Sequence, residues 1–102
     1  MNAGKGLEKE TKDKPRLTLV PRKIIFAIAK VREFGSRKYL TSDSWKLNKR
    51  EQYQDAAYRH FMAYLDDNDS LDEESGLPHL HHLATNIAFL IEGGFTDEKS
   101  DS

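Results

Sequence analysis

The sequence contains no cysteine, which excludes disulfide bridges and thiol chemistry and gives no sign of an oxidising compartment. No apolar run approaches the roughly 20 residues of a membrane span. The first residues also lack the apolar stretch of a signal peptide. The formal net charge is only −1, whereas a general nucleic-acid-binding protein normally carries a strong basic excess. We therefore expect a soluble, cytoplasmic protein without a membrane association or general nucleic-acid binding.

Apolar residues are scarce too, at 37% of the chain against 32% charged residues. Before residue 14 the only large apolar residue after the first methionine is Leu7, and after residue 92 it is Phe95. We expect a disordered tail at 1–13, a single helical domain at 14–92 and a disordered acidic tail at 93–102. A domain this small supplies only a marginal core, which favours a homo-oligomer.

The ordered part begins with "KPRLTLVPRK", in which each of two prolines disfavours helix in the residue before it. This pattern predicts an extended basic N-terminal arm. From Arg22 to about Phe34, apolar residues recur at helical spacing, and Gly35 is a suitable C-terminal stop. The polar stretch "GSRKYLTSDSWKLN" is then expected to be a loop.

Two further helices follow in the sequence. Asn48 and Glu51 have the spacing of a capping box, and the helix they open is expected to reach about Leu65. The last helix is expected to start near Pro78 and to end before Gly93. The inner face of the second helix should carry Tyr53, Ala56, Ala57, His60, Phe61 and Tyr64, and the packing stripe of the third Leu80, Ala84, Ile87, Ala88 and Ile91. The fold class is thus all-α, a small three-helix domain with a basic arm.

Three histidines fall within four residues in "DEESGLPHLHHLATNIAFL". His79, His82 and Asn86 have the spacing i, i+3, i+7 and share one helix face, near a helix start that favours anions. They could be polar residues beside a core, part of a phosphate pocket, or metal ligands. No metal is expected, but the candidates for one are Asp72, Glu74, His79 and His82. His60, among apolar residues, is a hydrogen-bonded core residue, a possible third ligand beside His79 and His82, or the candidate catalytic group.

Basic and aromatic residues precede this segment and could build an anion pocket if the arm crosses the helices. Arginine gives forked contacts to phosphate and lysine acts as a point charge, while aromatic rings stack on bases. Trp45 could instead fill the core under its loop. The candidate ligand-binding residues are Lys14, Arg16, Arg37, Lys38, Tyr39, Trp45, Arg59, His79, His82 and Asn86.

Four segments carry a resemblance: "KPRLTLVP", "FGSRKY" followed by a tryptophan, "YQDAAYRH" and "DEESGLPHLHHLATN". In combination they resemble the dATP/dGTP diphosphohydrolase, N-terminal, family, small proteins common in bacteriophages. The resemblance implies a setting in an infected bacterial host and the removal of pyrophosphate from purine deoxynucleoside triphosphates. The positions it singles out are Lys14, Pro15, Arg16, Gly35, Lys38, Tyr39, Trp45, Arg59, His60, Asp72, Ser75, Gly76, His79, His82 and Asn86.

Two functions follow, one with catalysis and one without. All-α pyrophosphohydrolases of the MazG type hold Mg²⁺ with an E-x-x-E pair on one helix and an E-x-x-D pair on another, and this chain has neither pair in a suitable place. We therefore favour a non-enzymatic protein that captures a purine nucleotide, a cyclic nucleotide or another nucleotide-derived signal of bacterial immunity, without a cofactor. The alternative is a dATP/dGTP diphosphohydrolase dependent on Mg²⁺ or Mn²⁺. An interaction protein without a small ligand is the third possibility.

Overall fold

A computed structural model describes residues 14–38 and 43–96 of the chain. In order, it contains the 3-10 turn η1 (Leu17–Leu19), the helix α2 (Lys23–Lys38), the 3-10 turn η2 (Ser44–Leu47), and the helices α3 (Arg50–Asp66) and α4 (His79–Glu92). No β-strand occurs in these residues, only an isolated bridge between Leu71 and Pro78. The all-α, three-helix prediction is therefore confirmed.

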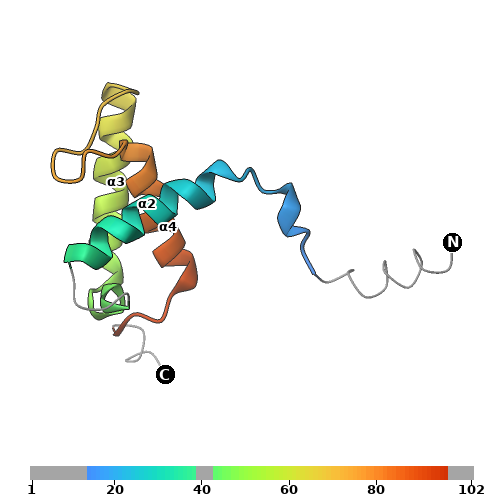
Figure 1. The fold of residues 1–102 in the computed structure, drawn as a ribbon. Helices are drawn as coiled ribbons and strands as arrows, with labels where there is room; N and C mark the ends of the chain where they lie inside the picture. The colour runs from blue at the N-terminus through green and yellow to red at the C-terminus, as the bar shows by residue number, and fades with distance from the viewer. Residues whose placement is uncertain (1–13, 39–42, 97–102) are drawn as a thin grey trace, which may run out of the picture.

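The helices α3 and α4 run antiparallel, joined by the loop 67–78, and α2 crosses over them (Figure 1). α4 is the central helix, because it packs against both α3 and α2. Residues 14–22, which include η1, are exposed and lead away from the helices (Figure 1). None of the described helices is long and apolar enough to cross a membrane.

Two helix boundaries differ from the sequence prediction. α2 does not stop at Gly35 but continues to Lys38, so Arg37 and Lys38 belong to its last turn rather than to a loop. Gly35 lies in helical conformation, without the positive φ of a C-terminal glycine. α3 is preceded by Lys49 as its N-cap, and the backbone N–H of Lys49 donates to Gln52 Oε1 at 2.9 Å. The capping interaction is thus one residue later than the predicted pair.

An aromatic cluster holds α3 and α4 together where α3 begins and α4 ends. The ring of Trp45 stacks on Phe89 with centroids 4.4 Å apart, and Tyr53 meets these two rings at 6.4 and 5.0 Å. Phe95 meets the rings of Trp45 and Tyr53 at 5.6 and 5.5 Å. The Tyr53 hydroxyl donates to the Trp45 carbonyl at 2.7 Å. Phe95 is only 1% exposed. The packed region therefore extends past residue 92, where the sequence placed the start of a disordered tail, because Phe95 closes this cluster.

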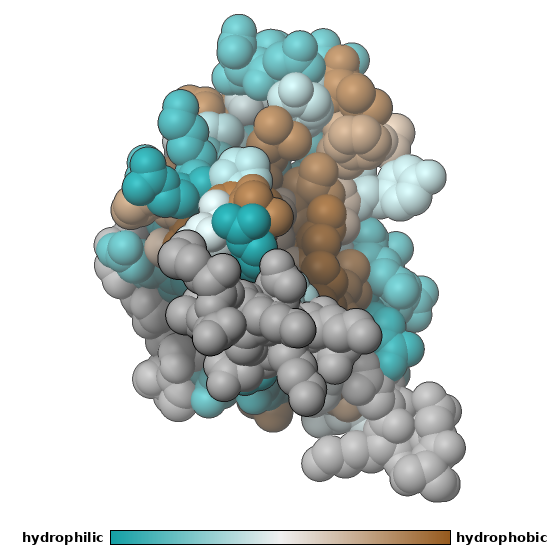
Figure 2. Space-filling view, turned by 90° about the vertical axis from the view of Figure 1, so that its right-hand side faces the viewer, coloured by the Kyte–Doolittle hydropathy of each residue, from teal (hydrophilic) through white to brown (hydrophobic). Residues whose placement is uncertain are grey.

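Apolar side chains are otherwise poorly covered. Phe95 is the one fully buried hydrophobic residue among those described. The predicted packing stripe of α4 is largely exposed, since Ile91 is 80% exposed and Ile87 44%. The buried residues of α4 are Thr85 and Asn86 instead. Figure 2 shows a band of hydrophobic residues on the surface of one face. The stripe prediction was wrong because α2 and α3 together cover a different side of α4.

Candidate functional site

The loop 67–78 ends in a tight turn that aims two polar side chains at α4. The Asp72 N–H donates to the Leu77 carbonyl, and the Gly76 N–H donates to the Asp72 carbonyl, both at 2.8 Å. Gly76 has φ +72, a left-handed conformation that favours glycine. The Asp72 carboxylate accepts from the Ser75 N–H at 2.8 Å. The acidic connector is therefore an ordered turn at this point.

Three histidines from two helices meet beside this turn. His60 on α3 and His79 at the start of α4 approach with their Nδ1 atoms 2.9 Å apart. The ring of His82 stacks on that of His60, with centroids 4.7 Å apart and 12° between the planes. Ser75 Oγ lies 2.6 Å from His82 Nε2, and Asp72 Oδ2 lies 3.7 Å from the same nitrogen. We call His60, Asp72, Ser75, His79 and His82 the histidine cluster.

The surroundings keep two of these histidines neutral. Burial, reinforced by His82, lowers the pKa of His60 from 6.5 to about 4. Burial also lowers the pKa of His82, although the nearby Asp72 opposes the change. Burial alone would raise the pKa of Asp72, but hydrogen bonds from Ser75 outweigh it and hold that pKa below its usual value. At neutral pH the contact between Asp72 and His82 is thus between a carboxylate and a neutral ring, and His60 is a weaker base than an ordinary histidine.

The cluster has the composition of a metal-binding site. His60, Asp72 and His79 each offer one ligand atom, and these three atoms lie within 4.8 Å of one another. All three side chains are half-buried. Of the metal candidates named from the sequence, Asp72 and His79 belong to this group and His82 adjoins it. Glu74 is exposed on the turn.

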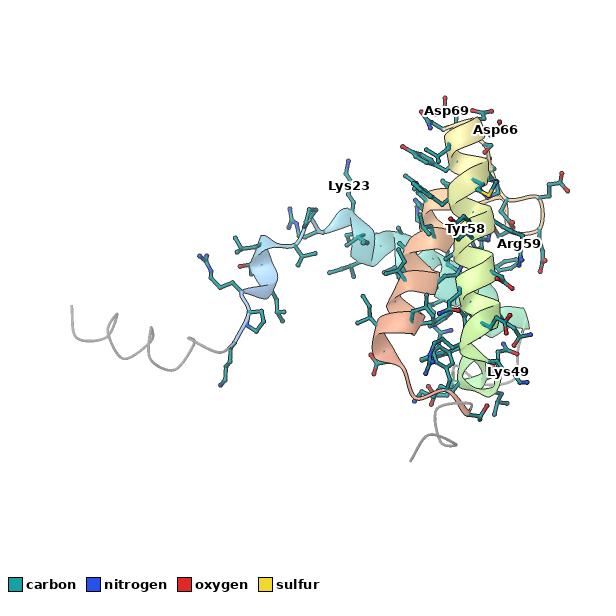
Figure 3. The ribbon with its side chains drawn as sticks, turned by 180° about the vertical axis from the view of Figure 1, so that it is seen from behind. Lys23, Lys49, Tyr58, Arg59, Asp66 and Asp69 are labelled. Carbon is teal, nitrogen blue, oxygen red and sulfur yellow. The ribbon has the colours of Figure 1, made fainter. Side chains whose placement is uncertain are left out.

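A pocket of about 560 Å³ opens beside the cluster. Asp72 and His79 form part of its wall, and the remaining lining comes from the end of α3 and from the connector. The other lining residues are Ala63, Asp66, Asp67, Ser70, Leu71 and Glu73. Figure 3 shows Asp66 and Asp69 at this end of α3. The carboxylates give the pocket a negative character, which attracts cations.

Two further polar residues of α4, Asn86 and His81, lie outside the cluster. Asn86 is 8% exposed, so it lies inside the packed helices rather than on an open surface. His81 belongs to the same turn of α4 but not to the cluster. Burial and the charge of Lys30 lower its pKa. Its Nδ1 is the one buried side-chain nitrogen or oxygen among the described residues that has no hydrogen-bond partner.

Among the basic and aromatic candidates, Arg59 adjoins the cluster, whereas Lys14, Arg16 and Trp45 lie away from it. Lys14 and Arg16 lie on the exposed segment that leads away from the helices (Figure 1). Trp45 belongs to the aromatic cluster at the other end of α3. Arg59 is exposed on α3 next to His60 and helps to lower its pKa (Figure 3). Arg37 and Lys38 end α2, and Tyr39 lies outside the described residues.

Sequence reasoning placed His79 and His82 on one face and named His60 as a possible third metal ligand or catalytic group, without being able to place it in space. Their meeting depends on the antiparallel packing of α3 and α4, which the spacing within one helix cannot show. The sharp turn had a usable signal in "DEESGLP", an acidic residue followed by Ser, Gly and Pro.

The chain also matches a known family over almost its entire length. The model for the family described as dATP/dGTP diphosphohydrolase, N-terminal, matches residues 4–102. This confirms the resemblance that the four sequence segments indicated. Searches of curated proteins and of solved structures give no match.

Proposed function

The chain belongs to the dATP/dGTP diphosphohydrolase N-terminal family, and on this premise we propose that it binds a phosphate-bearing purine nucleotide, or a nucleotide-derived signal, and retains it intact. The family description names purine deoxynucleotides, which makes dATP and dGTP the first ligands to consider. Capture in stoichiometric amounts would serve a bacteriophage protein that removes an immune signal from the cytoplasm of its host.

The observation that carries the proposal is the histidine cluster. Imidazole rings at the start of a helix can donate N–H groups to phosphate oxygens, alongside the free backbone N–H groups of the first turn. His60, His79 and His82 are within reach of one another there, and Arg59, which precedes His60 in α3, acts on His60 electrostatically. Arginine can add forked contacts to a phosphate.

The carboxylates of the described helices support retention rather than cleavage. α3 carries Glu51 and Asp55 in its first half, both exposed, and α4 carries only Glu92, at its end. Neither helix presents two acidic residues three positions apart facing the other helix. The four-carboxylate Mg²⁺ site of MazG-type enzymes therefore has no counterpart in this part of the chain.

The second candidate function is metal-dependent diphosphohydrolysis, as the family description implies. It is favoured by one observation, the grouping of His60, Asp72 and His79 beside a carboxylate-lined pocket. Water would attack the α-phosphorus of dATP or dGTP and the bond to the bridging oxygen would break. The products would be the nucleoside monophosphate and pyrophosphate. This function requires Mg²⁺ or Mn²⁺, whereas capture does not.

The two functions are separated by one experiment. The protein is mixed with dATP, dGTP, cyclic dinucleotides and cyclic ADP-ribose isomers in turn, each with and without Mg²⁺ or Mn²⁺, and then filtered. Capture predicts that one compound disappears from the filtrate and returns unchanged after heat denaturation. If monophosphate and pyrophosphate form only when metal is present, the function is hydrolysis and not capture. If every compound stays in the filtrate intact, nucleotide binding itself is refuted.

A pair of variants locates the binding. Arg59→Gln removes a positive charge next to the cluster, and Lys23→Gln removes one from the start of α2, far from Arg59 (Figure 3). Both side chains are exposed, so neither substitution should disturb folding. We expect Arg59→Gln to weaken retention about tenfold or more and Lys23→Gln to leave it unchanged. Equal effects of the two would place the ligand elsewhere.

A further inference from the structure

Two imidazole rings and one carboxylate converge from three separate segments of the chain. His60 comes from α3, His79 from the first turn of α4 and Asp72 from the turn between them. Their ligand atoms lie within 4.8 Å of one another. Ligands around a tetrahedral zinc ion, each about 2.0–2.2 Å from it, are roughly 3.3 Å apart. The three side chains thus stand close to the spacing that a single ion would impose.

The nitrogen pair shows how an ion would be held. The Nδ1 atoms of His60 and His79 face each other at 2.9 Å, so one of these rings must donate an Nδ1–H to the lone pair of the other. With both rings protonated at Nε2 instead, both Nδ1 lone pairs point into the space between them. The change moves a proton within one ring and requires no charge to be removed. An ion would then replace a single hydrogen bond by two coordinate bonds.

The third ligand is fixed before any ion arrives. The Asp72 carboxylate accepts the Ser75 N–H, and the Asp72 backbone is tied to Leu77 and Gly76 at 2.8 Å. Ser75 Oγ holds His82 Nε2 at 2.6 Å, and the ring of His82 lies flat on His60. Such hydrogen bonds outside the ligand set orient ligands and strengthen metal binding.

The neighbouring pocket provides the way in. It is about 560 Å³ in volume, shares Asp72 and His79 with the cluster, and is lined further by Asp66, Asp67 and Glu73. These carboxylates raise the local concentration of cations. The pocket also leaves open space beside the ligands, so that water or a phosphate oxygen could complete the coordination.

We propose that His60, His79 and Asp72 form a binding site for one divalent transition-metal ion of the zinc class. Two nitrogen ligands and one oxygen suit Zn²⁺, Co²⁺ or Fe²⁺, whereas Mg²⁺ prefers oxygen ligands alone. In this assignment His60 is a ligand rather than a general base, and His82 is a positioning residue. The site rests on side-chain geometry and stands whether or not the protein binds a nucleotide.

The test uses the full chain, treated with a chelator, and the metal alone. Isothermal titration with ZnCl₂ should show one ion per chain, and CoCl₂ should give visible absorption bands of a nitrogen- and oxygen-bound ion. His60→Gln, His79→Gln and Asp72→Asn should each weaken zinc binding about tenfold or more. The matched control is His81→Gln, because it removes a histidine from the same turn of α4 outside the cluster. It should leave the affinity within about twofold.

A measurement on the unaltered protein protects the test against misfolded variants. Nitrogen NMR of the imidazole rings should show the Nδ1 signals of His60 and His79 shift when Zn²⁺ is added, while those of His81 stay in place. Absence of zinc binding, or equal losses in His81→Gln and the ligand variants, overturns the proposal. So does displacement of the ion by an equal concentration of Mg²⁺. Failure to retain nucleotides, by contrast, would leave it untouched.

Discussion

Ser75 Oγ lies 2.6 Å from His82 Nε2, and this contact joins the turn at the end of the connector to α4. The same oxygen accepts the Leu77 N–H at 3.1 Å. Because Ser75 also binds Asp72 through its backbone N–H, one residue links the carboxylate, the turn and the histidines. The geometry of the histidine cluster therefore depends on a small hydroxyl side chain.

Removing this hydroxyl should destabilise the protein measurably. Ser75→Ala leaves half-buried groups of His82 and Leu77 without their partner, which should lower the free energy of unfolding by about 1–3 kcal/mol. Urea denaturation followed by circular dichroism measures the change. Glu73→Gln, on the exposed side of the same turn, serves as the control and should stay within about 0.5 kcal/mol. A Ser75→Ala protein as stable as the control would show that the contact contributes nothing.

Two glycines should respond to alanine in opposite directions. Gly76 has φ +72, a conformation that an L-residue adopts at a cost of about 1 kcal/mol, so Gly76→Ala should destabilise. Gly35 lies inside α2 and a Cβ there meets nothing within 4 Å, so Gly35→Ala should stabilise by about 0.5–1 kcal/mol. Thermal unfolding of both variants checks the signs. Two changes of the same sign would contradict the assigned backbone conformations.

Trp45 should matter for stability and not for ligand binding. It stacks on Phe89 and contacts Tyr53 and Phe95, so Trp45→Ala opens a cavity and should cost about 3 kcal/mol or more. Circular dichroism during urea denaturation follows this variant, which has no tryptophan left. Phe61→Ala is a suitable comparison, because this aromatic side chain is 44% exposed and should cost less. A Trp45→Ala protein that folds normally but no longer retains the ligand would indicate base stacking instead.

The sequence predicted what is local. Helical spacing of apolar residues located α2, α3 and α4, and Pro78 marked the start of the last helix. The end of α2 was predicted too early. A glycine can lie inside a helix at the cost of its low helical propensity, and Gly35 does so in α2. A glycine in the sequence does not reveal whether its φ is positive.

Contacts between segments could not be read in the same way. The spacing of His79 and His82 placed both on one face of α4, but only the packing of α3 against α4 brings His60 to them. Phe95 follows two glycines and looks like part of a tail, yet the space beside Trp45 and Tyr53 buries it. Which face of α4 is covered depended likewise on where α2 crosses.

The exposed apolar residues lead us to expect self-association with a second copy of the chain. With one fully buried hydrophobic residue among those described, the single chain covers little of its apolar surface, while Ile91 remains 80% exposed and Ile25 62%. Light scattering after size exclusion should give a mass above the 11.7 kDa of one chain. Ile91→Asp should shift the protein toward the monomer, and Tyr58→Asp, on the outer side of α3, should not. A monomeric wild-type protein at high concentration would refute this expectation.

Stability should fall in mild acid because His60 and His82 resist protonation. The pKa of His60 is about 4 in the folded chain and 6.5 without burial, so between these values the unfolded chain binds a proton that the folded chain does not. The free energy of unfolding must then decrease as the pH falls from about 6.5 toward 4. His82 acts in the same direction, while Asp72, whose pKa is lowered, adds a loss below about pH 3.8.

Urea denaturation with a chelator present, repeated at several pH values, measures the slope. His60→Gln should flatten it between about pH 6.5 and 4, since glutamine does not titrate. A wild-type slope of zero across that interval would mean that His60 is protonated in the folded chain at no cost, which is incompatible with its stacked contact to His82.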